Sequence, residues 1–299
     1  MTPAKTFARG TEARAAWLFL FPALGAIFAF FAIPVAAGFV LSLTDFDLYA
    51  VADPRNARFV AFGNYADLVR EPLFWRSLAN TLFLVLVGGP LTLAAALGGA
   101  LLVNSRAARL KGLFRTIYFA PVVTTLVAVA IVFRYLYHPR FGLLNHLLAF
   151  VGIGPIDWLG LPRYSMWAIT LLSVWRTFGY SLVILVAGLQ AIPETLYEAA
   201  RLDGASYAQQ FRHVTLPLLK PTLVFVTVLN TVGFFQIFAE PYVMTRGGPL
   251  DSTMSIALLM YQQGFRWWNM GRAAAIAFVL FALILALSGA QMALRRRAR

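Results

Sequence analysis

Two carboxylates in the segment 193–217 have the chemistry of a protein-docking surface. The segment is a polar interruption between two long apolar stretches, and Glu198 and Asp203 offer negative charge to a basic groove on another chain. Ala199 and Ala200 leave a smooth patch where a second backbone can come close. The segment therefore predicts a docking site, and a loop whose Ala and Glu merely favour helix is the weaker interpretation.

Helix signals in this segment indicate how these side chains are positioned. Pro193 and Glu194 favour the first turn of a helix. Gly204 can adopt the left-handed conformation that ends it, while Asp203 or Ser206 can cap a second short helix. We expect two short helices joined by a tight bend.

The other reactive side chains exclude several activities. No lysine stands in a G-x-x-x-x-G-K-[ST] loop, so any ATPase must be another chain. The histidines have no Cys or carboxylate at ligand spacing, so no metal site is predicted. Because no nucleophile, base and orienting group stand close together in the sequence, we do not expect an enzyme.

Composition places the elements that carry these residues in a membrane. With 60% hydrophobic and 12% charged residues, the chain lies outside the range of soluble domains. An all-α integral membrane protein is expected, with a single transmembrane domain over 15–294. Its six transmembrane helices are predicted over about 15–44, 77–105, 116–137, 164–192, 219–240 and 272–294.

Positive charge predicts the orientation of these spans. Six spans place both termini on one side of the membrane, and Lys and Arg are more frequent on that side. The tail 1–14, the segment 193–217 and the basic tail 295–299 are therefore expected in the cytoplasm. The net charge of +13 is a consequence of this topology, with contact to anionic membrane lipids as a side effect, and no nucleic-acid binding is predicted.

The segment 193–217 resembles the EAA loop of ABC-importer permeases. That loop reads Glu-Ala-Ala, three residues, Gly, nine residues, an aliphatic residue, any residue and Leu-Pro. The residues that fit this pattern are Glu198-Ala199-Ala200, Gly204, Val214 and Leu216-Pro217.

A similarity to the carbohydrate-uptake permeases extends over nearly the whole chain. It is carried by Phe62-Gly63-Asn64-Tyr65, Asn80-Thr81-Leu82, Gly142, Asn145, Trp158, Thr245 and Gly247-Gly248-Pro249. The chain is similar to the shorter version of the maltose-type first permease. The resemblance implies a type I ABC importer permease-like bundle.

The resemblance also implies a function. The chain would be the permease subunit of an ATP-driven, binding-protein-dependent importer that moves a mono- or oligosaccharide, or a related polyol, across the cytoplasmic (inner) membrane by alternating access. An ABC permease for a non-sugar solute such as glycerol phosphate, or an ion-coupled secondary transporter, is the alternative.

The implied partners are a sister permease, two nucleotide-binding ATPase subunits, an extracytoplasmic solute-binding protein and membrane lipids. The ATPase would bind ATP and Mg²⁺, so no cofactor is expected on this chain. The residues implied in ATPase coupling are Glu198, Ala199, Ala200, Asp203, Gly204, Leu216 and Pro217.

A substrate pathway is predicted in the fourth and fifth spans. Arg176 lies halfway along its span, where a charge normally faces the bundle interior or a wet cavity. Sugars are bound by polar groups and aromatic faces, and Glu240 stands near the outer end of the fifth span. The residues predicted to line the pathway are Trp175, Arg176, Tyr180, Asn230 and Gln236. A hydrogen-bond network that only holds helices together explains Arg176 equally well, and in some relatives the sister permease supplies most ligand contacts.

Overall fold

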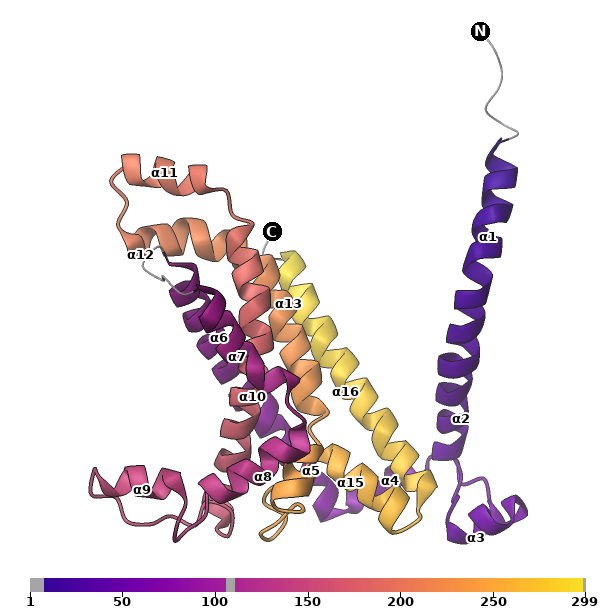
Figure 1. Ribbon diagram of the computed structural model, residues 1–299. Helices are drawn as coiled ribbons and strands as arrows, with labels where there is room; N and C mark the ends of the chain where they lie inside the picture. Colours follow the sequence, from indigo (N-terminus) through magenta and orange to yellow (C-terminus); the bar gives the residue numbers. More distant parts are fainter. Residues whose placement is uncertain (1–7, 106–110, 298–299) are drawn as a thin grey trace. The chain divides into compact units, whose positions relative to one another are not determined.

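The structure is a computed structural model that describes residues 8–105 and 111–297, and this part of the chain is built from helices (Figure 1). One isolated antiparallel bridge joins Thr44 and Phe59. Residues 1–7 and 298–299, which belong to the two expected tails, and the basic loop 106–110 lie outside the described residues. Contacts divide the chain into two compact units, Met1–Leu68 with Gln263–Phe278 and Val69–Gln262 with Val279–Arg299, and each is described by itself.

The first unit carries the first predicted span. Its elements are α1 (Ala8–Ile27), a π-helical segment (Phe28–Ala32), α2 (Ile33–Ser42), α3 (Leu48–Ala52), a 3-10 turn (Pro54–Asn56), α4 (Gly63–Arg70), a second π-helical segment (Gln262–Arg266) and the first turns of α16 (Met270–Arg297). The helical run Ala16–Ser42 is long and apolar enough to cross a membrane. It exposes nearly all of its large apolar side chains, as a span that faces lipid or another chain must.

The Asn-Tyr element of the first unit holds the end of α2. The side-chain amide of Asn64 donates to the carbonyl oxygens of Ser42 and Thr44 at 2.9 and 2.8 Å. The hydroxyl groups of Ser42 and Tyr65 lie 2.8 Å apart. These bonds satisfy carbonyls that the end of a helix would otherwise leave unpaired.

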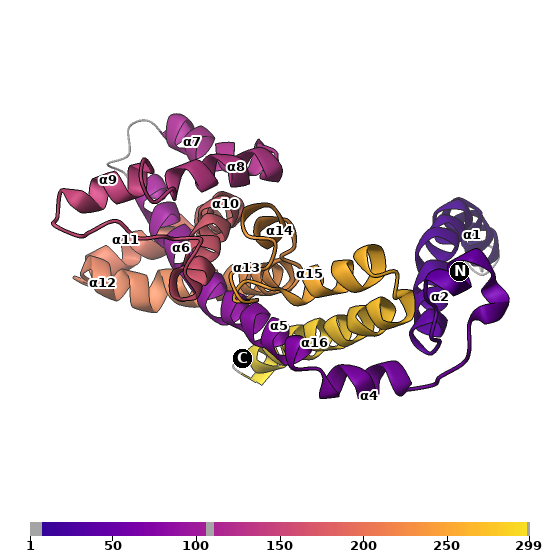
Figure 2. The ribbon, with the colours of Figure 1, turned by 90° about the horizontal axis from the view of Figure 1, so that it is seen from below.

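The second unit contains the helices that surround α10. Its elements are α5 (Pro72–Phe83), a π-helical segment (Leu84–Gly88), α6 (Gly89–Asn104), α7 (Lys111–Val123), α8 (Leu126–Leu136), α9 (Leu143–Ala149), α10 (Pro162–Gln190), α11 (Glu194–Leu202), α12 (Tyr207–Gln210), a π-helical segment (Phe211–Thr215), α13 (Leu216–Phe235), α14 (Ala239–Met244), α15 (Ile256–Tyr261) and the rest of α16. In Figures 1 and 2, α10 is central, and it packs against α6, α7, α13 and α14.

Close packing around α10 depends on small residues. A Cβ atom at Gly99 of α6 would lie 2.7 Å from Cδ1 of Leu182, and one at Gly188 of α10 would lie 2.8 Å from Oγ1 of Thr222. Between membrane helices such close approach matters because van der Waals contact, rather than exclusion of water, holds them together. The buried core here is formed by Ala96, Ala100, Val103, Leu182, Leu185, Val186, Leu189, Leu219 and Val226.

The third predicted span differs from the expectation. Five described helical runs are long and apolar enough to span a membrane: Ala16–Ser42, Pro72–Asn104, Pro162–Gln190, Tyr207–Met244 and Met270–Ala293. The range 116–137 instead forms parts of two helices, α7 and α8, separated by Thr124 and Thr125. The hydroxyl of Thr124 donates to the carbonyl oxygen of Pro121 at 2.8 Å, which is the acceptor that a continuing helix would pair with the N–H of residue 125.

Asparagine side chains also fix the loops of the second unit. The amide of Asn80 donates to the carbonyl oxygens of Asp251 and Met254 at 2.9 and 3.0 Å. Asn145 accepts a 2.9 Å hydrogen bond from the indole N–H of Trp158. The polar residues that carry the resemblance in these loops therefore have structural partners.

Candidate functional site

The segment 193–217 folds as the two short helices expected from its sequence. α11 begins after Pro193, and its end is set by Gly204, whose φ is +75°. The N–H of Gly204 donates to the carbonyl of Arg201 at 3.1 Å, and the N–H of Ala205 donates to that of Ala200 at 2.9 Å. This pattern, with a left-handed glycine, closes the C-terminus of a helix and reverses the chain.

Ser206, rather than Asp203, caps the second helix. The N–H of Gln209 donates to Oγ of Ser206 at 3.4 Å, and the N–H of Ser206 donates to Oε1 of Gln209 at 2.7 Å. This reciprocal pair is a capping box. α12 then continues through the π-helical segment into α13, so the bend is built on a membrane helix rather than on a free loop.

The two short helices lie at one end of the bundle of the second unit (Figure 1), and side-chain hydrogen bonds hold the segment together. The hydroxyl groups of Tyr197 and Thr215 are 2.9 Å apart. The side-chain amide of Gln210 donates to the carbonyl of Ala205 at 2.8 Å. A force applied to α11 therefore reaches α13 through hydrogen bonds as well as through the chain.

Nearly all of the predicted coupling residues are on the surface. Ala200 is half-buried, and the exposed members of the set are Glu198, Ala199, Asp203, Gly204, Leu216 and Pro217. Two residues that the sequence prediction omits, Leu202 and Tyr207, are 90% and 92% exposed. Their signal was present in the sequence, since they are the large apolar residues on either side of the bend. Exposed apolar groups beside carboxylates suit contact with another protein.

A cavity of about 270 Å³ lies between α10, α13 and α14 and is called the Arg176 cavity below. Its principal lining residues are Arg176, Tyr180, Asn230, Gly233, Ile237 and Glu240. All of them belong to the second unit. Polar side chains and Tyr180 thus line one half-open cavity within the apolar part of the chain.

An ion pair lies at this cavity. Nη1 of Arg176 is 3.5 Å from Oε1 of Glu240, and the exposed fractions of the two side chains are 37% and 4%. The Nε atom of Arg176 is buried and has no hydrogen-bond partner within the described residues. One nitrogen of the guanidinium is therefore unpaired in the described part of the chain.

Asn230 also has a donor without a partner. Its Oδ1 atom accepts a 3.0 Å hydrogen bond from the hydroxyl of Ser181, which orients the amide. Its Nδ2 atom is buried and has no partner in the described part of the chain. Such buried, unpaired donors are uncommon in folded proteins and occur where a ligand or water is bound.

Two of the five predicted pathway residues do not line the cavity. Trp175 packs against Phe133 of α8, with ring centroids 5.2 Å apart, because successive residues of a helix point about 100° apart and Trp175 therefore lies beside the cavity-facing side of α10. Gln236 is exposed at the end of α13. Glu240 was not among the predicted lining residues, although its sequence position, as an acid at the edge of an apolar stretch, was a signal.

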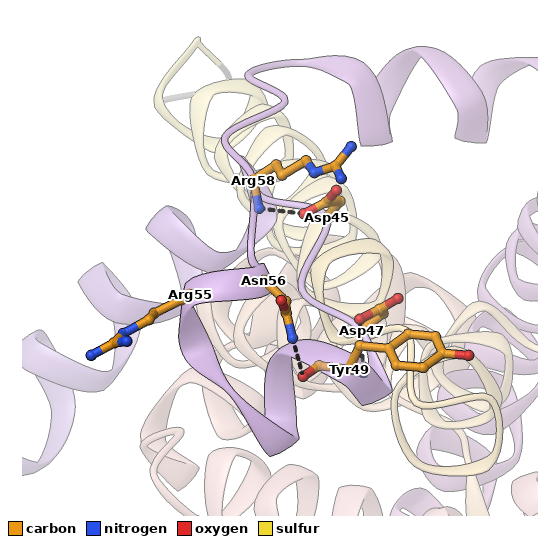
Figure 3. Close-up of a pocket in the computed structure, with 6 residues that line it drawn as sticks. All are labelled: Asp45, Asp47, Tyr49, Arg55, Asn56 and Arg58. Carbon is orange, nitrogen blue, oxygen red and sulfur yellow. Dashed lines mark hydrogen bonds between the residues drawn. The ribbon is translucent and has the colours of Figure 1, made fainter.

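A larger hollow of about 470 Å³ in the first unit has a different character (Figure 3). Oδ1 of Asp47 accepts from the N–H groups of Tyr49 and Ala50 at 2.9 and 3.1 Å, so this carboxylate caps α3. The side chains of Arg55 and Tyr49 point in opposite directions. The residues around this hollow stabilise loop backbone, and their side chains do not converge on one point.

Comparisons with known proteins match this chain to membrane components of transport systems. Residues 88–299 match the family described as "Binding-protein-dependent transport system inner membrane component". The lactose transport permease LacF of Rhizobium radiobacter is 35% identical over 91% of this chain and 91% of its own length. The trehalose/maltose transport permease MalF of Thermococcus litoralis is 35% identical over 92% of this chain and 91% of its own length.

A solved structure shows the same fold. It is a bacterial ABC transporter involved in the import of the acidic polysaccharide alginate, and one of its chains superposes with a TM-score of 0.79. The match covers 97% of this chain and 98% of that chain at 21% identity.

Proposed function

The chain belongs to the family of binding-protein-dependent transport system inner membrane components, and on that premise we propose that it is the permease subunit of an ATP-driven importer for a saccharide or related polyol. It is a multi-pass membrane protein. The observation that carries the substrate class is the 35% identity, over more than 90% of this chain, to relatives named for lactose and for trehalose and maltose.

The Arg176 cavity is the proposed place of the substrate. Arg176 and Asn230 each have a buried donor without a partner in the described residues, and hydroxyl or ring oxygens of a sugar can accept from both. Tyr180 lines the same cavity and offers an aromatic face to sugar C–H groups. Of the pathway residues predicted from the sequence, these three remain in the proposal.

The segment 193–217 is the proposed contact with an ATPase subunit. The exposed surface around Glu198, Asp203 and the left-handed Gly204 offers carboxylates and apolar groups together. The residues proposed for coupling remain Glu198, Ala199, Ala200, Asp203, Gly204, Leu216 and Pro217, to which Leu202 and Tyr207 are added. The ATPase pair would bind ATP and Mg²⁺, and the termini and this segment would lie in the cytoplasm.

A sister permease and an extracytoplasmic binding protein complete the proposed assembly. Closure of the ATPases would move α11 and α12 and, through α13, alter the access of the Arg176 cavity. Changing such an equilibrium from 1:99 to 99:1 requires about 5.5 kcal/mol of differential binding. The hydrogen bonds within the segment 193–217 support this role because a loosely attached helix could not transmit so much free energy.

Purification with reconstitution tests the proposal. The chain is tagged and extracted together with its associated subunits, and mass spectrometry identifies those subunits. The purified complex is then placed in liposomes with the copurifying binding protein, and sugar uptake is measured. We expect a second permease, a Walker-motif ATPase and sugar uptake that requires ATP. Uptake driven by an ion gradient, or recovery of the chain alone, would contradict the proposal, and uptake of only a non-sugar solute would contradict the substrate class.

A further inference from the structure

Glu240 is a buried acid next to the proposed substrate. Its side chain is 4% exposed, and it lies on α14, directly after the span α13. An ionised carboxylate at such depth is costly unless a counter-charge compensates it. Arg176 of α10, 64 residues earlier in the chain, supplies that charge at 3.5 Å.

The two charges balance within the cavity. Among the lining residues of the Arg176 cavity, Arg176 is the one base and Glu240 is the one carboxylic acid, and the others are apolar or neutral polar side chains. The arginine is the more accessible partner, with 37% of its side chain exposed against 4% for the acid. A ligand in the cavity therefore contacts a guanidinium whose positive charge is already compensated by the more deeply buried Glu240.

We propose that Glu240 is a specificity-determining residue that makes the Arg176 cavity select uncharged saccharides over anionic ones. The inference rests on the proposed function, because it concerns the same cavity. It names the substrate class as neutral sugars or polyols and excludes uronates and other acidic sugars.

An anionic sugar is disfavoured because its binding would leave the buried Glu240 without a counter-charge. An anionic sugar bound to Arg176 would compete with Glu240 for the guanidinium and would leave that carboxylate buried and without compensation. A neutral sugar needs no such exchange. Its oxygens can accept from N–H groups of the Arg176 guanidinium and of the Asn230 amide, each of which has a buried nitrogen, Nε and Nδ2, without a partner in the described residues.

A purely structural role for the ion pair makes a different prediction. If Arg176 and Glu240 only held α10 against α14, then Glu240→Gln would lower stability and leave the preference between neutral and anionic sugars unchanged. The sugar preference is thus the readout that separates specificity from stability.

The test measures sugar binding to the assembled transporter without its binding protein, so that the selectivity of that protein does not contribute. The probes are two pairs, glucose with glucuronate and galactose with galacturonate, in which a neutral sugar and its uronate share the same ring stereochemistry. Binding is measured by saturation-transfer NMR and calorimetry. The variants are Glu240→Gln and the double variant Arg176→Gln/Glu240→Gln. Asp67→Asn, which removes an exposed acid on α4, is the matched control.

We expect the wild-type transporter and Asp67→Asn to bind the neutral sugars at least tenfold more tightly than the uronates. Glu240→Gln should shift this ratio at least tenfold toward the uronates, because Arg176 is then uncompensated. The double variant should lose that shift.

Two results would overturn the inference: wild-type preference for uronates, or an unchanged ratio in a folded Glu240→Gln transporter. If Glu240→Gln does not assemble, the inference is tested by the affinity ratio of neutral sugars to uronates in the wild type and in the double variant. A double variant that binds uronates as tightly as neutral sugars would exclude selection by the Arg176 charge balance. Failure of every variant and of the wild type to bind any sugar would instead contradict the proposed substrate class.

Discussion

The hydroxyl of Tyr197 in α11 lies 2.9 Å from the hydroxyl of Thr215, at the entrance to α13. The two positions are 18 residues apart in the chain, and their contact joins α11 to the beginning of α13. A side-chain hydrogen bond therefore attaches α11 to α13 in addition to the chain itself.

Removing this contact should weaken coupling more than it weakens sugar binding. Tyr197→Phe and Thr215→Val should each lower stability by about 1 kcal/mol and reduce the amount of sugar imported per ATP hydrolysed. Because both variants break the same hydrogen bond, the double variant should cost less than the sum of the two. Unfolding of the purified transporter and parallel uptake and ATPase assays measure this, and strictly additive losses would show that the two hydroxyls act independently.

Substitutions at Gly204 should rank by their tolerance of a left-handed backbone. The φ of +75° costs other L-residues roughly 1–2 kcal/mol, and Asn tolerates it best. A Cβ atom added at Gly204 would meet no atom of the described residues within 4 Å, so the cost comes from the backbone rather than from a clash. We expect uptake and ATPase copurification to fall in the order Gly, Asn, Ala, Val. Equal function of Gly204→Val and wild type would contradict a requirement for this bend.

Charge reversal at Glu198 should release the ATPase. Glu198 is exposed on α11, so Glu198→Lys should insert and fold normally while repelling a basic groove on the partner. Affinity for the ATPase should fall at least tenfold, measured by titrating the purified subunits. Asp67→Lys makes the same change at an exposed acid of α4 outside the segment 193–217 and should leave this affinity unchanged. Unaltered binding by Glu198→Lys would remove Glu198 from the contact.

Two glycine-to-alanine substitutions should differ in their effects on stability. A Cβ atom at Gly188 would lie 2.8 Å from Oγ1 of Thr222 and 2.9 Å from Cδ1 of Leu219. Gly188→Ala should therefore cost about 1–3 kcal/mol. A Cβ atom at Gly98 would have no described neighbour within 4 Å, so Gly98→Ala should be neutral or stabilising by up to about 1 kcal/mol. Thermal unfolding of the purified transporter measures the stability of both variants. Equal effects would show that α10 and α13 can move apart at Gly188 without a loss of stability.

The family, the helical class and the two short helices of the segment 193–217 could be predicted from the sequence because each depends on residues that are near one another in the chain. Apolar stretches of sufficient length predict spans wherever they lie in the bundle. The bend at Gly204 follows from helix-ending chemistry over a few residues, and so does the capping of α12, although choosing Ser206 over Asp203 required the hydrogen bonds themselves.

The composition of the Arg176 cavity depended on the tertiary structure. Trp175 and Arg176 are neighbours in the sequence, yet successive residues of a helix point about 100° apart, so one packs on Phe133 and the other faces the cavity. Large apolar residues occur on both the buried and the exposed sides of α10, so hydrophobicity alone does not indicate which side is inward. The pairing of Arg176 with Glu240 spans 64 residues and arises only when α10, α13 and α14 pack, because contact between distant charges is set by the packing of their helices and not by their spacing in the chain.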